Sequence, residues 1–291
     1  MRKSIAVFIL LIVGTCAARS VAVRFGIPMR ALPTPNGGLT GAVSAQATDT
    51  SRPDLFSGAA QRVIPFRMLY PARSPGVFAF HVPDAGPMVD AIAKSHGWIS
   101  RVLFAQIGTL AAPWTDAAAP SGPGPFAVIL YLPGVTGYMQ MGSFQTTELA
   151  VQGYVVVTLN QPGAVAAVVL PDHRIIPGMS REDAAALISP SYVSSDQAFP
   201  GGFAAKLAPE HSIVPYLAAD VPIVLDRLTE INADPAHGLL GLDRVGVMGM
   251  SLGAIVTAQA CALDARIDAC LMMDAPVPTD VATIGLRQAA L

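Results

Sequence analysis

The pentapeptide GMSLG at residues 249–253 constrains this chain more than any other feature. It lies between an apolar β-type segment at residues 244–248 and a stretch at residues 254–260 that is typical of a helix. A serine flanked by glycines two positions before and two after, in the order strand, turn, helix, is the nucleophile-elbow pattern. The turn is so tight that a β-carbon fits at neither glycine position. The pattern therefore predicts that the hydroxyl of Ser251 is exposed at the carboxyl edge of a sheet; the alternative is a chance pentapeptide.

The rest of the chain alternates strand-like and helix-like segments. Strands are predicted at 41–46, 62–71, 126–132, 154–160, 244–248 and 269–274, and helices at 88–110, 146–152, 220–231 and 254–260. Pro65 favours an edge position for the second strand, and Asp220 is a candidate N-cap for its helix. Residues 161–215 show little periodicity and are interpreted as an excursion between sheet elements. This order predicts an α/β fold, with a mostly parallel, doubly wound sheet covered by helices on both faces.

The composition excludes several classes of function. Charged residues make up 13% of the 291 residues, against about 25% in average proteins, and the net charge is −2. This balance gives no electrostatic basis for binding nucleic acid. The five histidines and three cysteines are scattered without a metal-binding spacing, and no dinucleotide- or phosphate-binding glycine motif is present. We therefore expect no metal and no cofactor.

The N-terminus has the pattern of an export signal. A basic start is followed by an apolar run at residues 4–13 and by small residues that favour cleavage near Ala18. An uncleaved anchor and a lipidated Cys16 are the alternatives, and each of the three would export the protein. Residues 1–18 are thus predicted to be a signal peptide or N-terminal anchor, with peripheral membrane contact left open. Residues 19–40 form an extended arm, and residues 41–291 form the folded domain.

Export would also determine whether the cysteines can form a disulfide. In an oxidising compartment Cys261 and Cys270 could form a disulfide. Buried free cysteines are common, so the sequence leaves both alternatives open.

A serine nucleophile needs a base, an orienting acid and donors for the developing oxyanion. With Ser251 as nucleophile, the expected donors are the N–H of Leu252 and one N–H from the loop at residues 133–137, for which Val135 is the candidate. Asp274 is the candidate acid, because it follows a strand expected to end at the same sheet edge as Ser251. The alternatives are a plain strand-to-helix turn at residues 133–137 and an aspartate that caps the turn after its strand.

The residues around the elbow resemble the platelet-activating-factor acetylhydrolase group of α/β-hydrolases. The resemblance is carried by residues 242–253 and 258–267, with weaker support from residues 69–72, 132–134 and 224–228. It implies an α/β-hydrolase fold and a secreted or membrane-associated serine esterase, independent of metal, that cleaves short acyl groups from lipid-like esters. In this family the acid directly follows the strand after the elbow helix, which matches Asp274. The chain departs from the family at Pro133 and Met250, where family members commonly carry histidine.

The larger departure concerns the catalytic base. The family's histidine lies downstream of the acid, after two further strands, whereas no histidine follows Ser251. The five histidines that precede it are His81, His96, His173, His211 and His237. We therefore expect a fold without its C-terminal strands and a very weak or inactive esterase, unless an upstream histidine, His211 or His173 first, is recruited.

Three functions are thus compatible with the sequence. The first is a carboxylic ester hydrolase acting on a small ester or lipid. The second is an inactive homologue that binds an apolar ligand, and the third is a truncated product with no function of its own.

Overall fold

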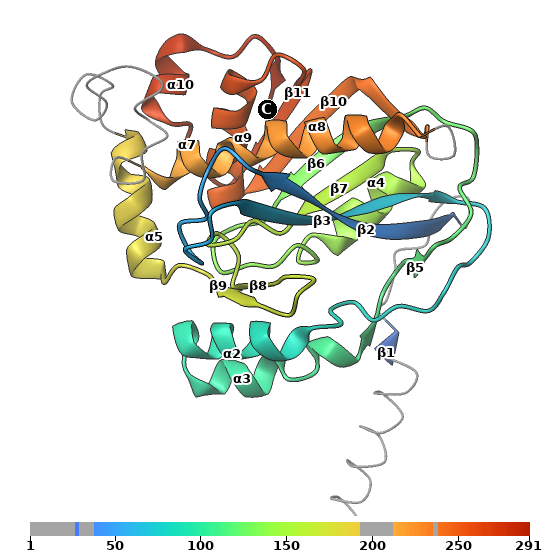
Figure 1. Cartoon of the computed structure of the whole chain (residues 1–291), viewed down its shortest axis with the longest axis horizontal. Coiled ribbons are helices and arrows are strands. Elements are labelled where there is room, and N and C mark those ends of the chain that lie inside the picture. Colours follow the sequence, from blue (N-terminus) through green and yellow to red (C-terminus); the bar gives the residue numbers. More distant parts are fainter. Residues whose placement is uncertain (1–26, 29–37, 193–211, 235–237) are drawn as a thin grey trace, which may run out of the picture.

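The sheet at the centre of the fold is mixed and mostly parallel. The computed structural model describes residues 27–28, 38–192, 212–234 and 238–291, and it contains an eight-stranded sheet in the order β12-β11-β10-β6-β7-β3-β2-β5 (Figure 1). The strands are β2 (Leu39–Asp49), β3 (Arg62–Ala72), β5 (Thr115–Asp116), β6 (Phe126–Leu132), β7 (Val155–Leu159), β10 (Leu240–Met250), β11 (Ala269–Met273) and β12 (Ala289–Ala290). Strands β7, β6, β10, β11 and β12 are parallel, whereas β3 is antiparallel to both of its neighbours.

Helices cover both faces of this sheet, as the alternating sequence pattern predicts. Helices α7 (Ile213–Ala218), α8 (Asp220–Asn232) and α9 (Leu252–Leu263) pack on one face, and α4 (Ser143–Val151) packs on the other (Figure 1). Buried valines, leucines and isoleucines of the central strands meet the apolar faces of α7, α8 and α9 in the largest core cluster. Their removal from water is the main contribution to stability.

Smaller elements surround the two covered faces. Helices α2 (Ala85–His96) and α3 (Trp98–Phe104) follow each other across a break at Gly97, within the segment predicted to be helical, and lie near the hairpin of β8 (Ala167–Val169) and β9 (Ile175–Pro177) (Figure 1). The remaining elements are β1 (Ile27–Pro28), η1 (Ile107–Thr109), β4 (Leu110–Ala111), α5 (Arg181–Ile188), η2 (Ser189–Tyr192) and α10 (Thr279–Ile284).

Two predictions about the chain were wrong in detail. Strand β3 is an interior strand, because it pairs with β2 on one side and β7 on the other. The carbonyl of Pro65 accepts a hydrogen bond from the amide of Asn160, just beyond the end of β7, so this residue faces β7. Proline has no N–H to donate, but the pairing of β3 with β7 has already ended at this position, so no strand hydrogen bond is lost and Pro65 is tolerated. The excursion at residues 161–215 contains regular structure, namely the β8–β9 hairpin, α5, η2 and the start of α7.

Asp220 does not cap its helix. The N-cap of α8 is Ala219, and the Asp220 carboxylate is fully buried in an ionic network instead. Asp220 accepts hydrogen bonds from Arg62 Nε and Nη2 at 2.7 Å each, from Arg52 Nη2 at 3.0 Å and from Gln161 Nε2 at 2.9 Å. Burial by itself lowers the pKa of Arg62, but the charge of Asp220 and its hydrogen bonds, together with Tyr216 and Asp54, outweigh burial and raise the pKa. The network joins β3, α8 and the segment after β7.

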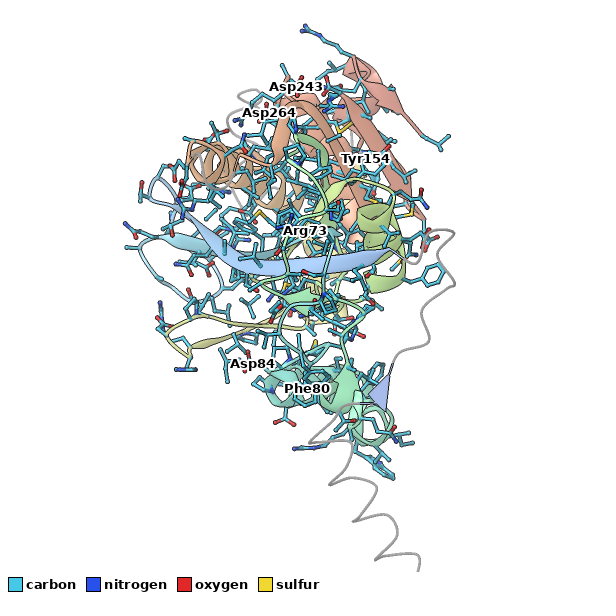
Figure 2. The ribbon with its side chains drawn as sticks, turned by 90° about the vertical axis from the view of Figure 1, so that its right-hand side faces the viewer. Arg73, Phe80, Asp84, Tyr154, Asp243 and Asp264 are labelled. Atoms are coloured by element: carbon cyan, nitrogen blue, oxygen red, sulfur yellow. A yellow bond between two sulfur atoms is a disulfide. The ribbon has the colours of Figure 1, made fainter. Side chains whose placement is uncertain are left out.

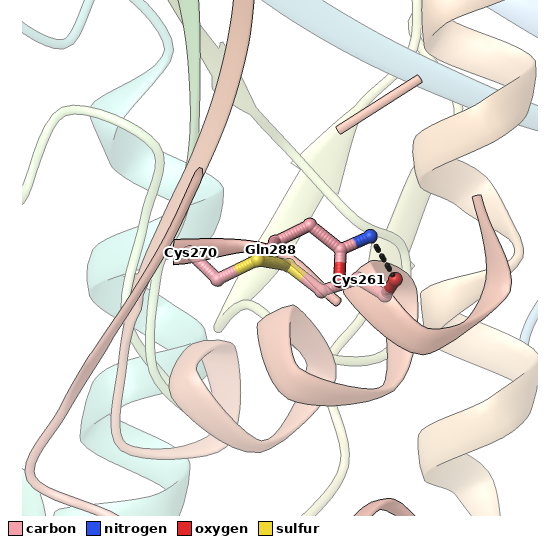
Figure 3. The surroundings of a disulfide bond; sticks show 3 residues. All are labelled: Cys261, Cys270 and Gln288. Atoms are coloured by element: carbon pink, nitrogen blue, oxygen red, sulfur yellow. Dashed lines mark hydrogen bonds between the residues drawn. A yellow bond between two sulfur atoms is a disulfide. The ribbon is translucent and has the colours of Figure 1, made fainter. Parts of the chain in front are cut away.

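A disulfide joins the end of α9 to the start of β11. Cys261 and Cys270 are bonded, which settles the alternative that the sequence left open. Gln288 Nε2 donates a hydrogen bond to the carbonyl of Cys261 at 2.8 Å, so the approach to β12 is attached at the same place (Figure 3). The elbow helix is therefore tied to the sheet at its C-terminal end.

The predicted signal or anchor at residues 1–18 lies outside the described residues, as does most of the predicted arm. Within the arm, β1 pairs with β4, and β2 begins at Leu39, slightly before the expected start of the domain. Among the helices of the described segments, none is long and apolar enough to cross a membrane.

The buried network yields a stability prediction. Asp220→Asn should lower the free energy of unfolding by about 3–5 kcal/mol, because Arg62 would stay buried without its counter-ion. The matched control is Asp226→Asn on the same helix, whose partner Arg266 is well exposed, and it should cost less than about 1 kcal/mol. Urea unfolding of both variants measures the difference, and equal effects would show that the network contributes no special stability.

Candidate functional site: a serine at a strained strand-to-helix turn

Ser251 occupies the sharp turn that the pentapeptide predicts. It lies between β10 and α9 with φ 55° and ψ −120°, a conformation that residues with a side chain rarely adopt. The two glycines are required by close contacts. A β-carbon at Gly249 would stand 2.1 Å from the carbonyl oxygen of Gly253, and one at Gly253 would stand 2.0 Å from the carbonyl oxygen of Leu132. The predicted elbow geometry is confirmed.

Asp274 emerges at the same edge of the sheet as Ser251. Strands β10 and β11 are parallel neighbours and end in register at Met250 and Met273, and the amide of Ser251 donates to the carbonyl of Met273 at 2.9 Å. Asp274 is the next residue, exposed and with φ 61°. The strand register thus brings the carboxylate to the edge where Ser251 lies, as predicted.

The loop after β6 lies against Ser251. A β-carbon at Gly134 would stand 3.3 Å from Ser251 Cβ and 3.8 Å from its Oγ. The loop is held in place because the amide of Gly137 donates to the carbonyl of Gly134 at 3.0 Å, and that of Thr136 donates to the carbonyl of Ala164 at 3.1 Å. The prediction that this loop comes to the elbow is confirmed.

Two backbone amides at this place have no protein acceptor. Leu252 is the first residue of α9, so its N–H has no partner within the helix. Val135 lies in the loop after β6. Within the part of the chain that the structure describes, neither amide donates a hydrogen bond. Both are therefore available to a ligand, as the donors of an oxyanion hole must be.

No described histidine is placed to act as a base on Ser251. His81 is buried and packs against Trp114 and Tyr138, and burial lowers its pKa to about 4. His173 is exposed at the tip of the β8–β9 hairpin. Ser251 Oγ makes no hydrogen bond to any residue that the structure describes. His211, His237 and the side chain of His96 lie outside what is described.

The arrangement can support nucleophilic attack by a hydroxyl on a carbonyl carbon. It combines a half-buried serine, two backbone amides at the elbow and in the neighbouring loop that donate to no described residue, and a carboxylate at the same sheet edge. Among the described side chains, no three His, Cys, Asp or Glu residues gather in a way that could hold a metal ion.

A second feature, which the sequence analysis did not identify, is a cavity lined by Arg67 and Gln140. Arg67 stands between Phe66 and Met68 in a strand that is otherwise largely apolar. A charged residue in such a strand is a signal that could have drawn attention to it.

Comparisons with known proteins identify the fold. A ferulic acid esterase from Streptomyces cinnamoneus superposes with a TM-score of 0.64 at 22% sequence identity, over 91% of this chain and 67% of that protein. A dienelactone hydrolase-like promiscuous phosphotriesterase from metagenomic libraries has a TM-score of 0.41 at 13% identity, over 87% of this chain and 67% of that one. No family model and no curated protein matches the sequence. The chain has the α/β-hydrolase fold, as predicted.

The elbow contacts yield a second prediction. Gly249→Ala should lower the free energy of unfolding by about 1–3 kcal/mol or more, because the new methyl group would overlap the backbone of Gly253. Gly246→Ala on the same strand is the control, since its nearest neighbour would lie at 3.7 Å. Thermal unfolding compares the two, and a Gly249→Ala variant as stable as the control would contradict the elbow geometry.

Proposed function

We propose that this chain is a hydrolase of carboxylic esters that uses Ser251 as its nucleophile. The observation that carries the proposal is the strained Ser251 turn, together with the backbone amides of Leu252 and Val135, which donate no hydrogen bond to a described residue. In the proposed mechanism Ser251 Oγ attacks the ester carbon while its proton passes to solvent water, and the two amides stabilise the negative charge on the oxygen. The ester C–O bond then breaks, and the alkoxide leaves as the alcohol with a proton from solvent. A water molecule hydrolyses the acyl-serine, which releases the acid and restores Ser251. Asp274 is proposed as the acid that orients a base.

Lipid-like or short-acyl esters are the proposed substrates. This part rests on the resemblance of the elbow segment to platelet-activating-factor acetylhydrolases. It is supported by two apolar side chains that follow the loop after β6, Met141 and Phe144, which are about half exposed at 50% and 54%. The similarly folded ferulic acid esterase shows that this fold accommodates ester hydrolysis.

We further propose that the protein is exported. The support is the apolar N-terminal segment with its basic start, together with the disulfide between Cys261 and Cys270. Disulfides of this kind persist in oxidising compartments and are rare in the cytosol.

The absence of an imidazole beside Ser251 among the described residues favours a second candidate function. In that case the chain binds an apolar ester or lipid without turning it over. A serine without a base has no acceptor of suitable pKa for its proton, and the leaving alkoxide has no acid to protonate it.

Hydrolysis of p-nitrophenyl acetate separates the two candidates. We expect slow turnover, because loss of the base alone costs about 10⁶ in rate in a well-studied serine hydrolase. Ser251→Ala should remove this turnover while leaving the unfolding midpoint unchanged. Ser121→Ala, an exposed serine in the loop before β6, should behave like the unaltered chain.

Two results would count against the hydrolase. Turnover that persists in Ser251→Ala would mean that another group reacts. No turnover by the unaltered chain, combined with saturable binding of a fluorescent lipid, would establish the second candidate instead.

A further inference from the structure

A cavity of about 490 Å³ lies beside the antiparallel part of the sheet. It is lined by β2, β3, the start of α2, the β8–β9 hairpin and residues 138–140 of the loop after β6, and it is open to solvent on one side. Neither Ser251 nor Asp274 lines it. Its volume is within the range of about 300–1,000 Å³ that is typical of small-molecule sites.

Arg67 brings a buried positive charge to this cavity. Arg67 is only 7% exposed, and its Nε donates a hydrogen bond to Ser44 Oγ at 3.2 Å. Its guanidinium carbon lies over the ring of Trp114, 5.3 Å from the ring centroid. Among the described residues, neither Nη nitrogen has a hydrogen-bond partner and no carboxylate lies within ion-pair distance. A buried cation without an anion is costly, so this arrangement points to a missing partner.

The charge of Arg67 is only partly offset by its surroundings. Burial lowers the pKa of the guanidinium, and the more distant charge of Asp116 opposes this without cancelling it. An arginine nevertheless stays protonated in proteins. Arg67 therefore contributes a positive charge to the wall of the cavity.

Gln140 supplies a second unsatisfied group. It is also only 7% exposed, it lines the same cavity, and its side-chain amide has no hydrogen-bond partner within the described residues. The amide atoms are not among the fully buried atoms without a partner, so they are open to the cavity and can meet a ligand there. Two such groups, Arg67 from β3 and Gln140 from the loop after β6, thus meet at one cavity.

We propose that this cavity binds a small organic carboxylate, with Arg67 holding the carboxylate and Gln140 donating a further hydrogen bond to it. The apolar body of the ligand would lie along Val82, Met88 and Tyr138, which line the same cavity. Guanidinium and carboxylate match in geometry, which makes their hydrogen bonds strong.

The charge of the cavity favours a monoanion over phosphate. Among the described residues that line it, Arg67 is the one arginine and the exposed His173 is the one histidine, and the exposed Asp84 at the rim, where α2 begins, would repel a doubly charged ion (Figure 2). The proposal does not depend on the nucleophile, and Ser251→Ala should bind the carboxylate as the unaltered chain does.

Isothermal titration with benzoate tests the proposal. Benzoate should bind the unaltered chain at one site, and Arg67→Met should weaken binding at least about tenfold, because a charged hydrogen bond is lost. Arg73→Met is the matched control, since Arg73 is exposed just after the end of β3 and does not line the cavity (Figure 2), and the benzoate affinity of this variant should be unchanged. Benzamide, which has the same shape without the charge, and inorganic phosphate should bind at least about tenfold more weakly than benzoate.

Several outcomes would overturn the proposal. They are no binding of benzoate by the unaltered chain, equal binding of benzamide or phosphate, and unchanged affinity in a folded Arg67→Met variant. If Arg67→Met fails to fold, Ser44→Phe decides the matter. Ser44 is an exposed residue that lines the cavity, and a phenyl ring there should block it. Unchanged benzoate affinity in Ser44→Phe would also contradict the proposed site.

Discussion

The close approach of α9 to the end of β6 is the constraint on which the site depends. Gly253, in the first turn of α9, lies so near the carbonyl of Leu132 that no side chain fits between them. This contact holds Ser251 in its strained conformation, with the loop after β6 beside it. A strained residue persists only where the surrounding structure determines it, and here the position of β10 between β6 and β11 does so.

The elbow helix is fixed at both of its ends. At its start, Gly253 packs closely against the end of β6 and against Gly249 of β10. At its end, the disulfide between Cys261 and Cys270 bonds it to β11. On the same face of the sheet, the buried Asp220 ties α8 to β3 through Arg62. The helical layer is therefore attached to the sheet at several separate places, which keeps the turn at Ser251 from relaxing.

The sequence predicts those parts of the structure whose patterns are local. The bounds of strand β6 were predicted correctly because a strand buried on both faces is continuously apolar. The elbow was predicted because the tight turn needs glycines at fixed positions within five consecutive residues. The β8–β9 hairpin was missed because its apolar residues pack on distant segments and leave little periodicity. Asp220 was read as a helix cap because its partner Arg62 lies far away in the chain. The cavity was missed for the same reason, since the lack of partners for Arg67 and Gln140 is a property of the folded state alone.

We propose that Ser251 is a nucleophile whose oxyanion is held by the amides of Leu252 and Val135. The most direct test is a crystal structure of the chain after prolonged treatment with a small fluorophosphonate. The account predicts a phosphorus atom bonded to Ser251 Oγ, with its phosphonyl oxygen about 3 Å from the amide nitrogens of Leu252 and Val135. An adduct on another residue, no adduct on Ser251, or an oxygen turned away from both amides would contradict it.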